Sequence, residues 1–169
     1  MSQTSKFRKY RLSDEYLIFY YKFIEPNLQH ISESNSKNLF STLVEKTWTP
    51  WLGFSFERFC LKNAYYLAEK MNFAEEVLHA APFYAQGDSK FQIDLIYKRS
   101  DKVLTVCEIK YHDSPISSKI IPEFERKLVL LEKPNGFTTE KARISFYGAD
   151  KSLKDAEYFN HIITLEDIL

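Results

Sequence analysis

The chain has 169 residues, which is enough for one domain or for one domain with a helical extension. Its 23 basic and 23 acidic side chains cancel, so the overall charge does not by itself indicate a nucleic-acid binder. The only cysteines, Cys60 and Cys107, lie far apart in apolar stretches and lack metal-binding spacing, so no zinc site is expected. No apolar run reaches the roughly 18 residues of a membrane span. We therefore expect a soluble, cytoplasmic protein without membrane contact.

The first part of the chain is predicted to form a helical arm, residues 1–48. Ser13 is a predicted N-cap, the almost wholly apolar run 16–24 follows it, and Pro26 is expected to end the helix. Such an aromatic helix has to be buried, either on the rest of the chain or on a partner. A short helix over about 37–45 completes the arm.

A second domain, residues 49–169, is predicted to begin with a long helix over about 51–71. Thr49 and Pro50 resemble an N-cap followed by proline at the first helical position. Glu57 lies on a stripe of this helix that also carries small residues, which favour close packing on a sheet. Glu57 could therefore face the sheet, and the alternative is a glutamate in solvent.

The rest of the chain alternates between strands and helices. The predicted elements are a strand over 77–84, a turn at 87–89, a hairpin over 91–110, a helix over 117–133, a strand over 142–147, a short helix over 151–157, a strand over 159–164 and a final turn capped by Thr164. This α-β-β-β-α-β order predicts a mixed α/β fold around a central mixed sheet.

The predicted hairpin carries charges inside both strands: Asp94 on the first strand, Glu108 and Lys110 on the second. If Arg99 pairs with Val103, the apolar faces of the two strands coincide, and Asp94 lies opposite Glu108. Like charges in that position destabilise a sheet. The register therefore predicts that the two carboxylates need compensation.

Three kinds of compensation are open: one acid takes up a proton, Lys110 neutralises the pair, or a cation binds between the acids. Two carboxylates with room for water suit Mg²⁺, and Lys110 could then act on a water or on a phosphate. The alternative is a surface ladder of salt bridges without chemistry.

The strings QID at 92–94 and EIK at 108–110, preceded by the helical Glu57, resemble the PD-(D/E)XK nuclease superfamily. The element order is also similar to that of this restriction-endonuclease-like fold. The resemblance implies that Asp94 and Glu108 bind Mg²⁺ (or Mn²⁺), that Lys110 stands beside the attacking water, and that Glu57 is an auxiliary catalytic acid. Gln92 would line the site.

Longer segments resemble one branch, the nuclease-like domain found C-terminal to P-loop ATPase modules in prokaryotic ATPases. These segments are YRLSDEYLIFYYKFIEPN at 10–27, WLGFSFERFC at 51–60, QIDL, CEIK, a helix with a lysine such as Lys127, and the ending HIITLEDIL. None of the four glycines begins a phosphate-binding GxxxxGK[ST] loop, so the ATPase module itself is absent.

Two functions follow as expectations. The first is a Mg²⁺-dependent nuclease that hydrolyses DNA rather than RNA, with His112 and Lys127 in contact with substrate. By periodicity Lys127 is expected to face outward. The second is an inactive nuclease-fold module whose aromatic N-terminal helix docks on a separate P-loop ATPase or on a second copy of the chain.

Overall fold

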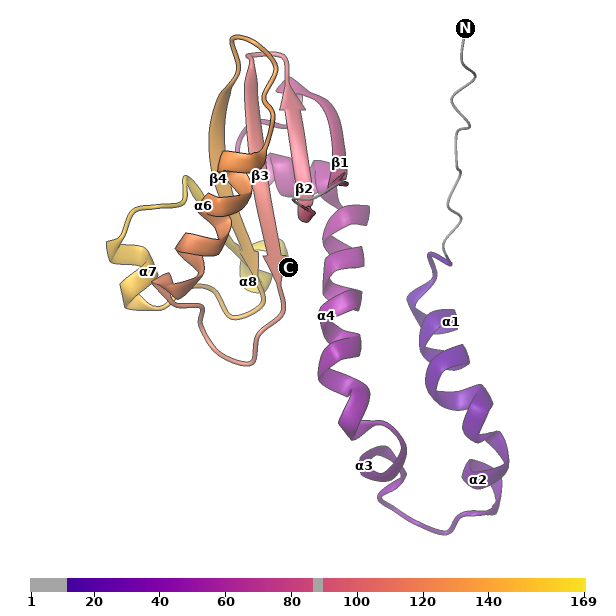
Figure 1. Ribbon diagram of the computed structural model, residues 1–169. Helices are drawn as coiled ribbons and strands as arrows, with labels where there is room; N and C mark the ends of the chain where they lie inside the picture. The colour runs from indigo at the N-terminus through magenta and orange to yellow at the C-terminus, as the bar shows by residue number, and fades with distance from the viewer. Residues whose placement is uncertain (1–11, 87–89) are drawn as a thin grey trace, which may run out of the picture. The chain divides into compact units, whose positions relative to one another are not determined.

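The computed structural model describes residues 12–86 and 90–169, and the chain divides into two compact units, 1–51 and 52–169 (Figure 1). Each unit is described by itself. The division falls a few residues after the expected one at residue 48. The predicted turn at 87–89 lies outside the described residues. None of the helices in the described part of the chain is both long and apolar enough to cross a membrane.

The first unit is helical throughout its ordered elements. These are α1 (Glu15–Phe19), a π-helical turn (Tyr20–Ile24), a 3-10 turn (Glu25–Asn27), α2 (Leu28–Glu33) and α3 (Leu39–Leu43). Asp14, rather than the expected Ser13, is the N-cap of α1, because its Oδ1 accepts the N–H of Leu17 at 2.9 Å. Pro26 does not end the helical segment either. It lies at the start of the 3-10 turn, where a missing N–H costs little, and α2 follows directly.

Aromatic side chains form the interior of the first unit. Trp48 and Trp51 stack with ring centroids 4.9 Å apart, and Phe19 and Phe23 pack edge-on against Trp51 at 5.7 Å. Phe23 is buried, whereas Tyr16 keeps 69% of its surface exposed. The aromatic segment 16–24 was expected to be buried on most sides, and it is buried only where it packs on Trp48 and Trp51.

Helix α4 (Glu45–Lys62) begins before Pro50, so the prediction that Thr49 and Pro50 start the helix is wrong. The missing N–H of Pro50 would have bonded to the carbonyl of Lys46 in the first turn, so only one bond is lost. The continuous helix predicted over 51–71 is also interrupted at Asn63, and α5 (Ala64–Lys70) follows.

The second unit contains a five-stranded mixed sheet, as predicted. Its strands are β1 (Val77–Ala85), β2 (Phe91–Arg99), β3 (Val103–Lys110), β4 (Thr138–Ser145) and β5 (His161–Thr164), in the order β1-β2-β3-β4-β5. Strands β1, β2 and β3 pair antiparallel, whereas β3, β4 and β5 pair parallel. Strand β3 is therefore central, and it pairs antiparallel on one side and parallel on the other.

Helices cover both faces of the sheet. Helix α6 (Ile121–Leu130) and α7 (Lys151–Asp155) lie on one face, where Phe124 and Leu153 pack with Val106 of β3. Helix α5 and α8 (Leu165–Ile168) lie on the other face, where Leu67 and Ile168 pack with Cys107 (Figure 1). The side chains of β3 thus alternate between two cores, and Glu108 follows the direction of Val106 toward α6.

Candidate active site

The pairing of β2 with β3 follows the predicted register, but it covers Leu95 to Lys98 and does not extend back to Asp94. Leu95 pairs with Cys107 and Lys98 with Leu104, which is the register that brings Arg99 opposite Val103. The alternation predicted for β2 fails at Asp94, because Leu95 packs in the core under α5 whereas Ile93 packs in the core under α6. The side chain of Asp94 replaces a backbone acceptor of the β2–β3 ladder: its Oδ2 accepts a hydrogen bond from the N–H of Ile109 at 2.9 Å.

Asp94 is buried, with 6% of its surface exposed, in a strained electrostatic setting. Burial, followed by the charge of Glu108, raises its pKa above the ordinary value of 3.8. The N–H of Ile109 and the ammonium groups of Lys110 and Lys127 act in the opposite direction without cancelling the effect. Asp94 and Glu108 are thus close enough to repel each other, as the register predicts.

Glu108 is paired with Lys127, and this corrects the expectation that Lys127 faces outward. Nζ of Lys127 donates to the Glu108 carboxylate oxygens at 2.9 and 2.8 Å, and the lysine side chain is only 12% exposed. Lys127 lies three residues after the buried Phe124, on the same face of α6, so both side chains leave the helix toward the sheet. Lys110 Nζ lies 3.8 Å from the same carboxylate and is half exposed.

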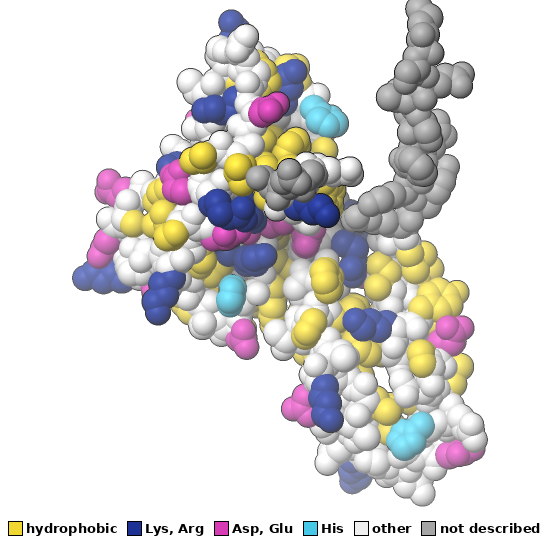
Figure 2. All heavy atoms as spheres, in the orientation of Figure 1, with side chains coloured by type: hydrophobic (Ala, Val, Ile, Leu, Met, Phe, Trp, Pro, Cys, Tyr) yellow, Lys and Arg dark blue, Asp and Glu magenta, His cyan; other side chains and the backbone are white. Residues whose placement is uncertain are grey.

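A pocket of about 390 Å³ opens in front of Asp94, Lys110 and Lys127. Its lining includes four of the expected catalytic or substrate-binding residues besides Lys127, namely Glu57, Gln92, Asp94 and Lys110. Gln92 donates from Nε2 to Asp94 Oδ1 at 3.3 Å. Glu57 therefore faces the site rather than bulk solvent alone. Figure 2 shows basic and acidic side chains gathered over α6 and the ends of β2 and β3.

A second, smaller pocket lies beside the first and contains a residue that the sequence analysis missed. This pocket of about 110 Å³ is lined by Glu108, Lys110, His112 and Arg143, with Glu123 and apolar residues of the α6 segment. Arg143 of β4 lies opposite Glu108 of β3 in the register of the parallel ladder. Its neighbours Ala142 and Ile144 point into the core on the opposite face of the sheet. The alternation of side chains along β4 could have indicated that Arg143 points toward Glu108, if the parallel pairing of β4 with β3 had been known.

Arg143 is 1% exposed, and its Nε and Nη2 atoms have no hydrogen-bond partner among the described residues. Burial lowers the pKa of this guanidinium to about 10, although the charges of Glu108 and Asp94 favour its protonated form. It remains a cation at neutral pH. Buried polar nitrogens without partners are rare in folded proteins, so this residue needs a functional explanation.

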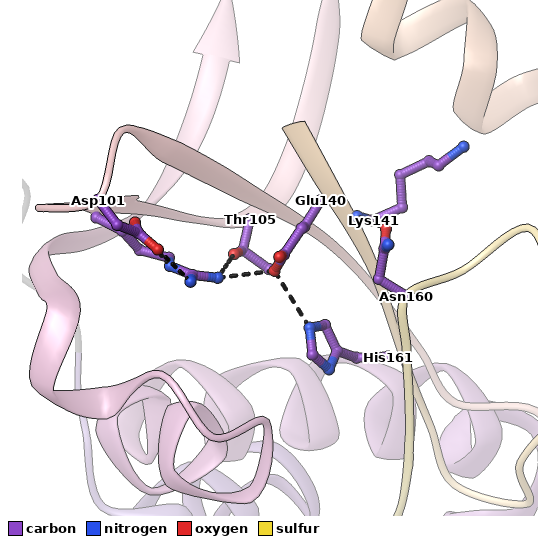
Figure 3. Close-up of polar contacts among 7 residues, drawn as sticks. Asp101, Thr105, Glu140, Lys141, Asn160 and His161 are labelled. Carbon is purple, nitrogen blue, oxygen red and sulfur yellow. Dashed lines mark hydrogen bonds and ion pairs between the residues drawn. The ribbon is translucent and has the colours of Figure 1, made fainter. Parts of the chain in front are cut away.

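The other buried arginine of the sheet, Arg99, is compensated completely differently. It binds Asp101 through Nε and Nη2, and its Nη1 binds Glu140 at 2.7 Å. Glu140 Oε2 also lies 3.2 Å from His161 Nε2 (Figure 3). This cluster, the Arg99 cluster, lies at the end of β2 away from Asp94. Since every group in it has a partner, it is a structural network.

The donor set at the main site suits a hard divalent cation. Asp94 and Glu108 are both buried on neighbouring strands, and burial, followed by the charge of Glu108, raises the pKa of Asp94. Asp94 lines the larger, polar pocket and Glu108 lines the smaller one, and carboxylates with room for water match Mg²⁺, which keeps several waters. Among the described residues, no group of three or more His, Cys, Asp or Glu side chains converges as a metal site. Any ion held here would therefore rely on two carboxylates together with water or backbone oxygen.

A family model described as archaeal and bacterial proteins of unknown function, DUF234, matches residues 20–121. The chain belongs to the DUF234 family. The match includes Glu57, Gln92, Asp94, Glu108 and Lys110, and it ends at the first residue of α6. Lys127 and Arg143 lie beyond the part of the chain that matches the DUF234 model. No curated protein matches the chain.

Proposed function

We propose that this DUF234 protein is a metal-dependent nuclease that hydrolyses phosphodiester bonds in DNA. The observation that carries the proposal is the buried pair Asp94 and Glu108 beside two lysines, with Asp94 at the wall of the larger pocket and Glu108 at the wall of the smaller one. A chain gains no stability from two buried carboxylates whose charges repel, so this arrangement is explained better by a ligand than by folding. The resemblance to the PD-(D/E)XK nucleases, on the same residues, supports this explanation.

In this proposal Asp94 and Glu108 would hold Mg²⁺ or Mn²⁺. The ion would act as a Lewis acid that stabilises negative charge on the phosphate oxygens in the transition state. The oxygen of a water forms a bond to phosphorus, and the bond between phosphorus and a sugar oxygen breaks. The water loses a proton, and the leaving oxygen gains one. The half-exposed Lys110 orients the water or stabilises the negative charge that develops on the phosphate oxygens.

The remaining residues of the site bind and position. Gln92 holds the Asp94 carboxylate through its amide, and Glu57 adds a third acid at the pocket wall. His112 is exposed at the end of β3, where a nucleic-acid strand could reach it. Lys127 compensates Glu108 and changes partner to a substrate phosphate when a cation binds the carboxylate. The resemblance to ATPase-associated domains adds a separate P-loop ATPase as a proposed partner.

The proposal is tested by metal binding followed by cleavage. Titration calorimetry with Mn²⁺ and Mg²⁺ should detect binding to the native chain and none to Asp94→Ala. Single- and double-stranded DNA and RNA should then be incubated with native protein, Asp94→Asn, Glu108→Gln and Lys110→Met. Asp155→Asn, which removes an exposed acid on α7, is the matched control and should cleave like the native chain. Cleavage that persists in Asp94→Asn would refute the assignment.

A second function, a docking module without activity, is favoured by the exposed aromatic residues of the first unit. More than half of the surface is exposed at Tyr16, Tyr21 and Phe40. Helix α1 also has no buried residue of its own. A second copy of the chain or an ATPase subunit could cover them. Sedimentation of the native chain and of a Tyr16→Ser, Tyr21→Ser variant would show whether these side chains support self-association. A monomer in both cases would leave only the ATPase partner.

A further inference from the structure

The small pocket beside the active site is lined by Arg143, a buried cation with two unpaired guanidinium nitrogens among the described residues. The contrast with the Arg99 cluster is direct, because there each nitrogen of the arginine meets a carboxylate or hydroxyl oxygen. Both Nε and Nη2 of Arg143 lack such a partner within the described residues. Leaving N–H donors of a charged group buried and unpaired lowers the stability of the folded chain. An acceptor supplied from outside the chain would remove that cost.

The acids nearest to this pocket are already paired with other cations. Glu108 accepts from Lys127 with both oxygens, and Glu123 accepts from Arg126 Nε and Nη2 at 3.1 and 2.8 Å. Lys110 also lies 3.8 Å from the Glu108 carboxylate, so the donors of this pocket that lack an acceptor within the described residues are Nε and Nη2 of Arg143. A guanidinium has only donors, so the group that completes it is an oxygen acceptor such as an oxyanion, not a second metal ion.

The shape of the pocket restricts which anion can enter. Its volume of about 110 Å³ corresponds to a few water molecules, at about 30 Å³ each. That accommodates one tetrahedral oxyanion but no nucleobase. The exposed His112 and half-exposed Lys110 lie at the side open to solvent, and the fully buried Arg143 lies at the inner side. The planar fork of a guanidinium matches two oxygens of a phosphate group.

We propose that Arg143, with Lys110 and His112, forms a phosphate-binding subsite adjoining the Asp94–Glu108 pair. The identity of the anion as a phosphate of the substrate strand or of its cleaved end rests on the proposed function. The presence of an oxyanion site does not, since it follows from the unpaired nitrogens and the pocket alone. Arg143 would then position a phosphate next to Lys110 without itself touching the bond that breaks.

Inorganic phosphate is the probe, used without metal and without nucleic acid, so that the result does not depend on nuclease activity. Titration calorimetry of the native chain should give binding in roughly the millimolar range, as expected for a single small anion. Arg143→Met should bind at least about tenfold more weakly, because the paired donors are lost. Lys154→Met, which removes one positive charge from the exposed side of α7, is the control and should bind like the native chain.

A readout on the native chain covers the case in which Arg143→Met does not fold. The Nε–H resonance of Arg143, assigned by comparison with Arg143→Lys, should shift as phosphate is added. No binding to the native chain, equal binding by folded Arg143→Met, or an unmoved resonance would each overturn the inference. Phosphate binding in a protein that cleaves no nucleic acid would refute the nuclease and leave the subsite intact.

Discussion

Lys127 Nζ donates to both carboxylate oxygens of Glu108, at 2.9 and 2.8 Å, from a helix on one face of the sheet. The ammonium group therefore occupies the side of Glu108 from which a divalent cation would bind. A metal ion and Lys127 compete for the same oxygens, and this competition leads to the first prediction.

Lys127→Met should make metal binding tighter and the metal-free protein less stable. Mn²⁺ no longer has to displace an ammonium group, whereas the buried Glu108 loses its main partner. The free energy of unfolding without metal should fall by about 2 kcal/mol, since hydrogen bonds to charged groups contribute roughly this much. Urea unfolding with and without Mn²⁺ measures both effects. Lys133→Met, an exposed lysine just beyond α6, should change neither. Unchanged Mn²⁺ affinity in Lys127→Met would show that no competition exists.

Asp94→Asn should stabilise the metal-free protein at neutral pH. The pKa of Asp94 is raised above 3.8 in the folded chain, first by burial and then by Glu108, so the folded state holds this proton more tightly than the unfolded state. Ionisation of Asp94 therefore lowers stability as the pH rises through the raised pKa. Removing the repulsion should add up to about 1 kcal/mol at pH 7.

The gain from Asp94→Asn should shrink as the pH falls toward 3.8, where Asp94 becomes protonated in both states. Thermal or urea unfolding in a metal chelator, across that range of pH, gives the comparison. Added Mn²⁺ should stabilise the native chain but not the variant. A gain that is the same at every pH would mean that the charge of Asp94 is not its cause.

Asp167→Ala should cost about 1 kcal/mol of stability at neutral pH, the usual effect of losing a helix cap. Asp167 Oδ2 accepts the N–H and hydroxyl of Thr164 at 2.7 and 2.8 Å, and these bonds lower the pKa of Asp167. Its contribution should be complete above pH 3.8 and be lost as the pH falls through the lowered value. Glu166→Ala, at the neighbouring exposed acid, is the control in urea unfolding. Equal losses in the two variants would argue against the cap.

Cys60 and Cys107 should resist thiol reagents until the protein unfolds. Burial, followed by the charges of Glu57 and Asp94, raises the pKa of Cys60 to about 12, and Cys107 is buried completely. Almost no thiolate exists at pH 8, and the reagent has no access to it. Labelling with a chromogenic disulfide should be at least about a hundredfold slower than in concentrated guanidinium. Fast labelling of the native chain would show that α4 and α5 separate readily from the sheet.

The register of the hairpin was predictable from Leu95 onward, because the apolar alternation of that part leaves only one register that buries both strands well. The pairing of Leu95 with Cys107 confirms that register. The capping of α8 by Thr164 was also readable, since a capping box depends on residues three apart in the sequence. Local patterns of this kind carry their partners within a few residues.

What could not be read depended on partners far away in the chain. Lys127 was expected in solvent because nothing near it in the sequence shows that Glu108 lies across the interface of α6 and β3. Arg143 went unnoticed because its neighbourhood arises only when β4 pairs parallel to β3. Pro50 was misplaced because Phe19, Phe23 and Phe40 pack on Trp48 in the helical turn before it, and these tertiary contacts outweigh the local preference of proline.

The central place of β3 has a consequence for the dynamics of the site. Its backbone is held by β4 along its whole length, by β2 as far as Cys107 and by the Asp94 side chain at Ile109, so Glu108 and Lys110 share a strand that can open only when much of the sheet opens. Their amide protons should be among the slowest of the chain to exchange with solvent. Adaptation to a ligand must then come from rotamer changes on nanosecond timescales, and the long side chains of Lys110 and Lys127 have the freedom that the strand lacks.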